Sequence, residues 1–305
     1  MRFIKLDLNL LVALDALLTE VSVTRAAEKV HLGQSAMSNA LTRLREYFGD
    51  ELLVQVGRKM EPTPRALALK DPVRDVLIRI EAAVAVQPEF DPARSDREFR
   101  LAVSDYTNAM LIPHLLELTE RQSSTVRFNL LPQTFSPKRS LENGEVDLLI
   151  IPSQFVSDEH PSELLFSETF CCAVWKDSLL AHGEMTLDRY LSQGHVVMEP
   201  GNAQSYETRE MANMGIHRRI EVTTFSFTTA PKFVVGTSRI ATLHTRLARQ
   251  AERVLPIVIK PVPVKIEPLQ QMVQWHKYRT NDLGIAWLRQ MLLQATSAMN
   301  AAHTA

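Results

Sequence analysis

Residues 24–45 constrain the fold of this chain more than any other segment, because they read as two short helices joined by a tight turn. The apolar residues of the second helix recur at helical spacing, which predicts that they pack inward together. They are Ala36, Met37, Ala40, Leu41 and Leu44. The side chains expected on the opposite face are amides, hydroxyls and a guanidinium: Gln34, Ser35, Ser38, Asn39, Thr42 and Arg43. The segment therefore predicts an amphipathic helix whose polar face contains no acid.

The polar face of this helix has the chemistry that reads base edges in the major groove of DNA. Asn and Gln bond adenine, Arg bonds guanine, and Ser or Thr bonds either. An ordinary solvated helix usually mixes Lys with Glu, whereas no acidic residue occurs from Gln34 to Arg45. The pattern therefore favours a helix-turn-helix that binds double-stranded DNA over a plain surface helix.

The flanking segments complete the predicted domain. Apolar spacing predicts an amphipathic helix over residues 8–21, and Ser22 caps the helix that follows it. Residues 51–56 and 60–62 are expected to pair as a hairpin. Three helices followed by a hairpin make a winged helix-turn-helix over residues 1–63.

Charge is informative here only through its local placement. The formal net charge of the chain is −1, and residues 1–65 carry nine Lys or Arg against eight Asp or Glu, a difference of +1. DNA contact must therefore come from individual side chains rather than from a basic field. We expect the turn of the hairpin to present two cations to phosphates or the minor groove. The predicted DNA-binding residues are Arg25, Gln34, Ser35, Ser38, Asn39, Thr42, Arg43, Arg58 and Lys59.

A further helix is expected over residues 64–90, where Pro64 stands at the first helical position. Its apolar residues follow steps of four, three, four and three, which is the spacing of a two-stranded coiled-coil seam. They are Leu69, Val73, Val76, Ile80 and Ala83. Pro72 removes one hydrogen bond and is expected to kink the helix. We interpret this segment as a dimerising linker helix, and packing on its own domain is the alternative.

The remainder, residues 91–305, alternates short strand-like and helical runs. Strands are expected at 99–103, 126–131, 146–151, 169–175, 195–198, 220–225 and 240–243. Helices are expected at 110–120, 136–143, 187–192, 205–214, 228–235, 245–251 and 285–299. This alternation predicts an α/β domain with parallel sheets covered by helices.

Several function classes lack their signatures in this chain. Cys171 and Cys172, paired with His195, are the one imaginable nucleophile–base set, but both cysteines lie in an apolar strand, where thiols are inert. There is no Gly-rich phosphate loop, no Gly-x-Ser-x-Gly elbow and no zinc spacing. We therefore expect no enzyme, no catalytic residue, no metal and no cofactor. Adjacent thiols and the lack of about 20 consecutive apolar residues predict a cytoplasmic protein without a membrane partner.

Six short motifs of the N-terminal part occur in a specific order. They are DLNLL at residues 7–11, TRAA at 24–27, QSAMS at 34–38, RLR at 43–45, LL at 52–53 and PTP at 62–64. In this order and spacing they resemble the LysR-type transcriptional regulators, and the resemblance covers essentially the whole chain. Two departures stand out. Gly33 replaces the serine that usually opens the reading helix, and residues 65–68 lack the usual glycine of the linker.

The C-terminal part is similar to the branch that contains the nodulation regulators and the regulators of aromatic-compound degradation. The supporting segments are LFSETF at 165–170, GHV at 194–196, RRIEV at 218–222, RIAT at 239–242 and WLRQ at 287–290. The resemblance implies a type 2 periplasmic-binding-protein architecture with two subdomains. Their expected limits are 97–167 with 270–300, and 168–269, with chain crossings near 166–169 and 268–273.

The resemblance also implies a homodimer that pairs into a homotetramer, RNA polymerase as a partner, and a small-molecule co-inducer bound between the subdomains. Such a ligand would meet the loops at the carboxyl ends of strands. The mixture of aromatic, hydroxyl and amide side chains there suits a small aromatic or phenolic effector. The predicted effector-binding residues are Ser104, Tyr106, Asn108, Phe135, Asn202, Phe227, His244 and Arg246.

Each of these residues also has a simpler interpretation. The aromatic ones fit a plain hydrophobic core equally well, and Arg246 fits either an effector carboxylate or a salt bridge within its own chain. We interpret the chain as a sequence-specific activator controlled by its effector. The alternatives are a repressor, an effector-independent regulator, or, further removed, a small-molecule binding protein without regulatory output.

Overall fold

The computed structural model describes residues 6–57, 59–84, 89–122, 124–133, 136–199 and 204–304. The chain divides into two compact units, which are treated separately below. Arg58, Phe135 and Asn202, three of the predicted site residues, lie outside the described residues.

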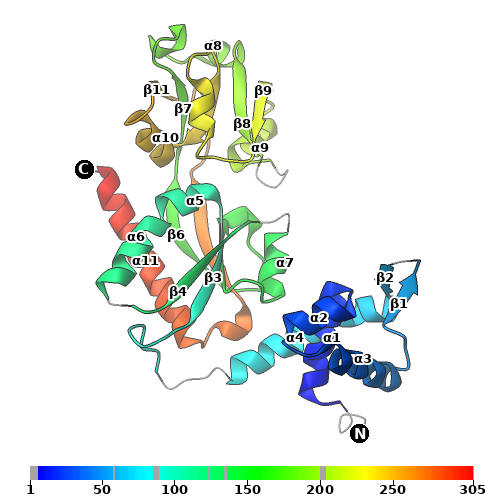
Figure 1. The fold of residues 1–305 in the computed structure, drawn as a ribbon. Coiled ribbons are helices and arrows are strands. Elements are labelled where there is room, and N and C mark those ends of the chain that lie inside the picture. Colours follow the sequence, from blue (N-terminus) through cyan, green and yellow to red (C-terminus); the bar gives the residue numbers. More distant parts are fainter. Residues whose placement is uncertain are drawn as a thin grey trace. The chain divides into compact units, whose positions relative to one another are not determined.

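The N-terminal unit consists of three helices, a hairpin and a long fourth helix (Figure 1). The elements are α1 (Leu8–Glu20), α2 (Val23–Lys29), α3 (Gln34–Phe48), β1 (Leu53–Val56), β2 (Lys59–Pro62) and α4 (Pro64–Val84). Local chemistry sets the helix starts: the Asp7 carboxylate accepts from the Leu10 N–H at 2.9 Å, and Ser22 caps α2. The predicted helix-turn-helix and hairpin are confirmed.

The core of this unit is built from the apolar faces of the helices and the start of the hairpin. Leu14 and Leu17 of α1, Met37 and Leu44 of α3, and Leu53 of β1 are fully buried. The prediction that Ala36 packs inward is wrong, because Ala36 is exposed. It lies about 100° around the helix from Met37, just outside the buried stripe.

The linker helix α4 packs part of its predicted seam within its own domain. Val73 is buried and Leu69 half-buried in the cluster formed with α1, whereas Val76 and Ala83 are exposed. An ion pair between Arg74 and Asp15 (2.7 Å) fastens α4 to α1. Burial raises the pKa of Asp15, and the nearby Arg74 guanidinium opposes that rise. The N-terminal half of the helix therefore follows the alternative interpretation, and dimerisation remains a prediction for the exposed positions.

The larger unit contains two five-stranded sheets, each with helices around it (Figure 1). The first sheet has the order β4 (Arg127–Pro132), β3 (Glu98–Val103), β5 (Leu148–Pro152), β12 (Leu269–Trp275) and β6 (Ser162–Glu168). Its helical segments are α5 (Asp105–Met110), α6 (Ile112–Arg121), α7 (Pro137–Glu142), η2 (Ser153–Phe155), η6 (Lys277–Arg279) and α11 (Leu283–Thr304). We call this part the first subdomain.

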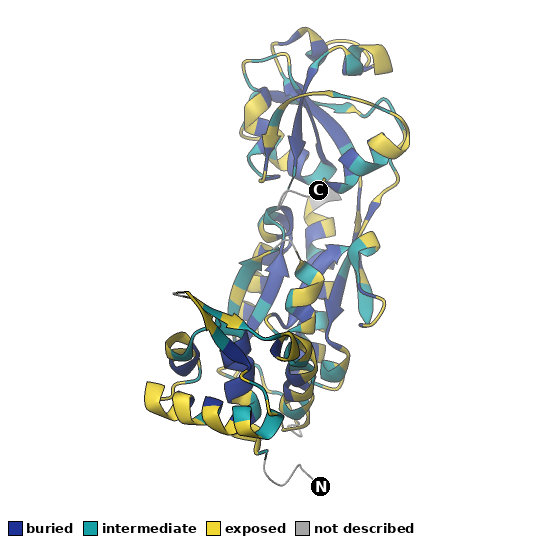
Figure 2. Ribbon diagram, turned by 90° about the vertical axis from the view of Figure 1, so that its right-hand side faces the viewer, coloured by how far each residue is buried: buried dark blue, intermediate teal, exposed yellow. Residues whose placement is uncertain are grey.

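The second sheet has the order β11 (Ile257–Pro261), β7 (Phe170–Trp175), β10 (Ile240–His244), β8 (Gly194–Met198) and β9 (Arg219–Thr224). Its helical segments are η3 (Leu179–Ala181), α8 (Leu187–Leu191), α9 (Tyr206–Asn213), η5 (Ala230–Val234) and α10 (Thr245–Glu252). We call this part the second subdomain. The central strands of both sheets are largely buried, whereas the edge strands β4 and β9 are mostly exposed or half-buried, and the helices turn exposed faces outward (Figure 2).

The sheets are mixed rather than wholly parallel, which corrects the prediction. The chain leaves the first sheet along β6 and returns along β12, so these neighbours must run in opposite directions, and they pair antiparallel. The same exchange makes β7 antiparallel to β11 and β10. β12 is antiparallel to its other neighbour, β5, as well. The remaining pairs, β3 with β4 and β5, and β8 with β9 and β10, are parallel as expected.

Three strands were missed by the sequence analysis: β6, β11 and β12. In β12 the buried side chains include Gln271 and Gln274, which break the apolar pattern of a core strand. The second chain crossing was expected near residues 268–273. Leu269 already belongs to β12, where it pairs with Glu168, so the crossing instead runs through residues 262–268. Residues 230–234 form a 3-10 helix where an α-helix over 228–235 was expected.

The second subdomain encloses a buried polar network. The side chains of Arg218 and Glu207 are 3% and 1% exposed and lie 3.0 Å apart. Thr208 accepts from Arg218 at 2.8 Å and donates to Glu207 at 2.9 Å, while the Tyr190 hydroxyl bonds Thr242 at 2.7 Å. Every charge in this group has a partner, as burial requires. The network fixes α9 by its inner face.

Two valines of α4 separate folding from dimerisation. We expect Val73→Asp to destabilise the N-terminal unit by about 3 kcal/mol or more, because it buries an unpaired charge against α1. Val76→Asp should leave the fold intact and yield monomers, because Val76 is exposed at a predicted seam position. Circular dichroism and light scattering after gel filtration measure the two effects. Val254→Asp, at an exposed site of the other unit, serves as the control, and a stable dimer of Val76→Asp would refute the seam.

Candidate nucleic-acid interface and ligand site

The predicted reading face of α3 is exposed as a whole. Met37, Leu41 and Leu44 hold the helix to the core. The six polar residues of the other face are all exposed: Gln34, Ser35, Ser38, Asn39, Thr42 and Arg43. Two members of this set are joined by a side-chain hydrogen bond, in which the Thr42 hydroxyl donates to the Ser38 carbonyl at 3.2 Å. The structure thus leaves the amide groups of this face pointing away from the core.

The start of α3 has the weak cap that the sequence indicates. Gly33 occupies the N-cap position with extended backbone and makes no side-chain bond, since it has no side chain. Its carbonyl accepts from the Met37 N–H at 3.1 Å, so the first helical turn still closes. Glycine costs only a few tenths of a kcal/mol relative to serine at this position. The departure from the family pattern therefore leaves the helix in place.

Acidic side chains pair with Arg25 and Arg43, two of the predicted DNA-binding residues. Arg43 pairs with Asp7 at 3.0 Å, and Glu20 receives Lys29 at 3.0 Å and Arg25 at 3.8 Å. Such exposed pairs are worth roughly 0–1 kcal/mol, so a phosphate can replace the carboxylate. Asp7 and Glu20 were not among the predicted residues, because their partners become visible only in the folded domain. Lys59 is exposed at the start of β2.

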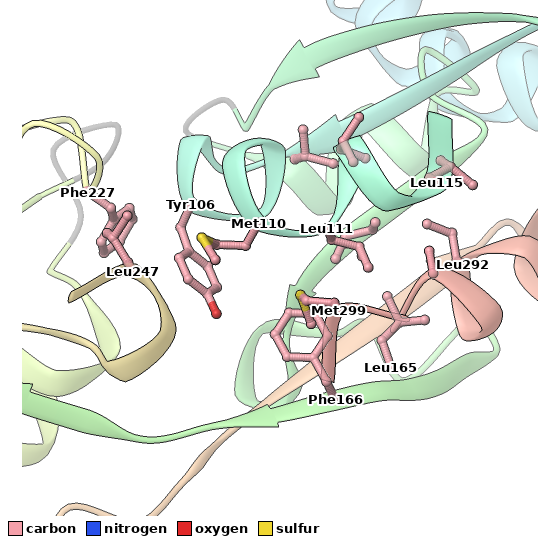
Figure 3. Packing of buried hydrophobic residues seen from close by; sticks show 14 of the residues in the cluster. Tyr106, Met110, Leu111, Leu115, Leu165, Phe166, Phe227, Leu247, Leu292 and Met299 are labelled. Atoms are coloured by element: carbon pink, nitrogen blue, oxygen red, sulfur yellow. The ribbon is translucent and has the colours of Figure 1, made fainter. Parts of the chain in front are cut away.

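Four of the predicted effector residues come together where the two subdomains meet. The Tyr106 ring of α5 stacks on His244 at the end of β10, with centroids 4.0 Å apart and an interplanar angle of 19°. Phe227 lies 5.0 Å from the same His244 ring. Figure 3 shows Tyr106 between Phe227 and Leu247 on one side and Phe166 and Met299 on the other. These rings form one continuous core through the junction.

The fourth residue, Arg246, is paired within the chain. It donates to the Glu168 carboxylate at 2.9 Å, to the Ser167 carbonyl at 2.8 Å and to Asn300 at 2.7 Å. The Tyr106 hydroxyl donates to the same carboxylate. Burial together with the Glu168 charge raises the pKa of Tyr106 well above its usual value. Arg246 therefore follows the salt-bridge alternative, and Glu168, which the sequence analysis missed, is its partner.

Asp105 makes a second polar connection across the junction. Its Oδ2 accepts from the Ser226 hydroxyl at 2.7 Å, the Thr228 N–H at 3.0 Å and the Thr228 hydroxyl at 3.1 Å. Next to it, Ser104 caps α5 by accepting from the Thr107 N–H at 3.2 Å, and Asn108 is exposed. The predicted loops therefore lie at the junction, and their role in effector binding stays a prediction. The contact with three donors belongs to Asp105, which was not among the predicted residues.

The buried histidines and cysteines have strongly shifted pKa values. Burial lowers the pKa of His244 and of His195 to about 4, so both rings are neutral near neutral pH. Burial raises the pKa of Cys171 to about 12 and raises that of Cys172 as well. A thiol that stays protonated is a poor nucleophile. These shifts weigh against the cysteine-based enzyme interpretation.

Two further features of the described residues concern metal ions and membranes. Within it, no group of three or more His, Cys, Asp or Glu side chains is placed to hold a metal ion. No helix among these same residues is long and apolar enough to cross a membrane.

Comparison with known proteins identifies the same two parts. The lysR-family model of the bacterial regulatory helix-turn-helix protein matches residues 8–67, and that of the LysR substrate binding domain matches residues 92–297. Nodulation protein D 1 of Bradyrhizobium sp. (strain NC92) is 40% identical over 307 residues, which cover 100% of this chain and 98% of that protein.

Solved structures agree with this assignment. A probable transcriptional regulator from Pseudomonas aeruginosa superimposes with a TM-score of 0.66 at 27% identity, covering 95% of this chain and 97% of its own. A full-length OxyR variant from the same organism superimposes with a TM-score of 0.73 over 94% of each chain, and its 17% identity makes this a likeness of fold.

A helix-turn-helix unit joined to a two-sheet ligand-binding unit defines a class of DNA-binding transcriptional regulators. The chain belongs to the LysR family within that class. It is accordingly a regulator that combines DNA binding with a domain for a small-molecule effector, and regulators of this family form oligomers.

The reading face of α3 generates a prediction for DNA binding. We expect Asn39→Ala and Gln34→Ala to lose about 1–3 kcal/mol of discrimination between operator and scrambled duplex, because each amide can make a bidentate base contact. Lys59→Ala should weaken binding to both duplexes alike. The dependence of affinity on salt concentration should become shallower by the equivalent of about one phosphate contact. Fluorescence anisotropy at several salt concentrations measures both effects. Gln250→Ala, an exposed amide of the other unit, is the control, and unchanged specificity of the α3 variants would refute the face.

The buried His244 generates a prediction for pH dependence. The folded protein resists charging this ring, whose pKa is about 4, whereas the unfolded chain binds the proton near 6.5. The stability it contributes is complete above about pH 6.5 and is lost as the pH falls from there toward 4. The wild-type free energy of unfolding, measured with urea, should fall between pH 6.5 and 5. His244→Phe, which keeps a ring against Tyr106, should make that fall smaller by about 1.5 kcal/mol. Gln250→Ala, which removes an exposed amide that does not titrate, should keep the wild-type slope, and an unchanged slope in His244→Phe would contradict the assignment.

Proposed function

We propose that this LysR-family regulator is an activator whose action on DNA is controlled by a small aromatic or phenolic co-inducer bound at the junction of the two subdomains. The observation that carries the proposal is the stack of Tyr106 on His244 with Phe227 beside it. Rings from both subdomains meet there, so a planar aromatic ligand finds apolar faces on either side.

The same proposal assigns roles on the DNA. The amides and hydroxyls of α3, together with Arg43, contact base edges, while Arg25, Arg58 and Lys59 hold phosphates. Asp7 and Glu20 occupy two of these arginines in the free protein. DNA binding then exchanges carboxylates for phosphates, and the specificity comes from the uncharged groups of the face.

Control by an effector requires only a modest coupling free energy. A tenfold change in DNA affinity corresponds to about 1.4 kcal/mol. The contacts of Asp105 with Ser226 and Thr228 are of the kind that a bound ligand strengthens or breaks when the subdomains move. We propose that this motion shifts a homotetramer between two arrangements on the promoter and so alters its contact with RNA polymerase.

An effector-independent regulator, activating or repressing, is the second candidate. It is favoured by one observation: the Tyr106 hydroxyl, both terminal nitrogens of Arg246 and the Asp105 carboxylate have partners within the chain. A junction satisfied in this way is stable without a ligand. The two candidates differ in whether any aromatic compound stabilises the protein.

A thermal-shift screen tests the proposed function. The purified full-length chain is heated with flavonoids, salicylates, hydroxybenzoates and chlorinated phenols, with cyclohexanecarboxylate as the non-aromatic control. A ligand at one hundred times its Kd adds about 2.7 kcal/mol of apparent stability. We expect at least one aromatic class to raise the Tm and to change the DNA footprint.

The converse result has an equally clear meaning. If the protein footprints DNA but no compound of the panel raises its Tm, the aromatic co-inducer is refuted and the effector-independent candidate stands. If a compound raises the Tm without altering the footprint or transcription, the ligand binds but the switch is refuted.

A further inference from the structure

Arg209 on α9 of the second subdomain contacts Phe155 of the first subdomain. The centre of its guanidinium lies 4.6 Å from the centroid of the Phe155 ring. The side chain is half-buried. Among the residues that the structure describes, no carboxylate or hydrogen-bond acceptor is paired with this guanidinium. A cation held across the junction by an aromatic face alone retains all of its hydrogen-bonding capacity.

Two other arginines of the larger unit are held by carboxylates. Arg246 is neutralised by Glu168 at 2.9 Å, and Arg218 by Glu207 at 3.0 Å. Asp105 is occupied by three donors from Ser226 and Thr228. Arg209 differs from these groups because, among the described residues, its guanidinium contacts an aromatic ring and no carboxylate.

The position of Arg209 on α9 also connects it with the aromatic residues of the junction. Tyr206 lies three residues earlier, on the same side of the helix, and stacks on Phe170 with centroids 5.8 Å apart. Phe170 in turn lies 5.2 Å from His244. The neighbouring side chains Glu207, Thr208 and Met211 are buried on the other side. The same side of α9 thus carries a guanidinium that contacts Phe155 and an aromatic ring that joins the contacts of Phe170 with His244.

We propose that Arg209 is the residue that selects the charge of the effector, and that the effector is a planar aromatic compound with an ionised acid group. The proposal rests on the function proposed above and adds the ligand class. A carboxylate or phenolate bonds the planar fork of the guanidinium, while the ring of the ligand stacks on Phe155. The cation–π contact of the free protein is weaker than such a charge-assisted bond, so the ligand replaces it.

Binding of matched acid and neutral compounds to the full-length chain tests this assignment. The probes are hydroxybenzoates against hydroxybenzamides and chlorinated phenols against their methyl ethers, measured by titration calorimetry. We expect the wild type to bind the ionised member of a pair at least tenfold more tightly. Arg209→Gln should remove that preference: its affinity for the ionised compound should fall at least tenfold, and its affinity for the neutral compound should stay within twofold of the wild type. Phe155→Leu should weaken the binding of both compounds of a pair.

Controls separate this proposal from the one on which it rests. Arg253→Gln removes an exposed arginine elsewhere in the second subdomain and should keep the wild-type preference. Equal binding of acid and neutral compound by the wild type, or an acid preference that survives in Arg209→Gln, overturns the role of Arg209 and leaves the aromatic co-inducer in place. Failure of the wild type to bind either member of any pair overturns both. Arg209→Lys, which keeps the charge but not the planar fork, should recover part of the preference and so exclude a loss of folding.

Discussion

A buried carboxylate at the first chain crossing is the interaction on which the ligand-binding unit depends. Glu168 is 2% exposed, ends β6 and precedes by two residues the start of β7. It receives the Tyr106 hydroxyl from the first subdomain and the Arg246 guanidinium from the second. Leaving such a charge without its partner costs about 3–5 kcal/mol. Side chains of both subdomains therefore bind Glu168 at the crossing, and this holds the surrounding aromatic residues against one another.

This connection also explains which residues are free to act. A side chain that helps to neutralise Glu168 cannot at the same time bind a ligand at full strength, so Arg246 is a structural residue in this state. Asp105 is fixed in the same way by its three donors. In the DNA-binding unit the pairs are exposed instead of buried, and their small free energies leave Arg25 and Arg43 exchangeable. Burial thus separates the cations that hold the fold from those that contact partners.

The sequence predicts most of what local patterns determine. The reading helix, the hairpin and the alternation of the larger unit follow from periodicity and capping, and the errors lie at edges, as with Ala36. The missed strand β12 contains buried Gln271 and Gln274, whose amides are satisfied by Thr107 and by Ser157. Such partners lie more than one hundred residues away in sequence. The contacts of Glu168, of Asp105 and of Arg209 with Phe155 were missed for the same reason, because only the fold brings these partners together.

The arrangement of the junction limits how an effector can act. A ligand shifts a conformational equilibrium only by the difference in its affinity for the two states. In the state seen here the subdomains are already joined by Asp105, Glu168 and the Tyr106 stack, so apolar contact alone gives a ligand little that the protein lacks. A ligand that also engages Arg209 gains a charge-assisted bond that no described side chain of this state provides. Under the proposed role of Arg209, this charge-assisted bond is what lets an effector favour one arrangement over another.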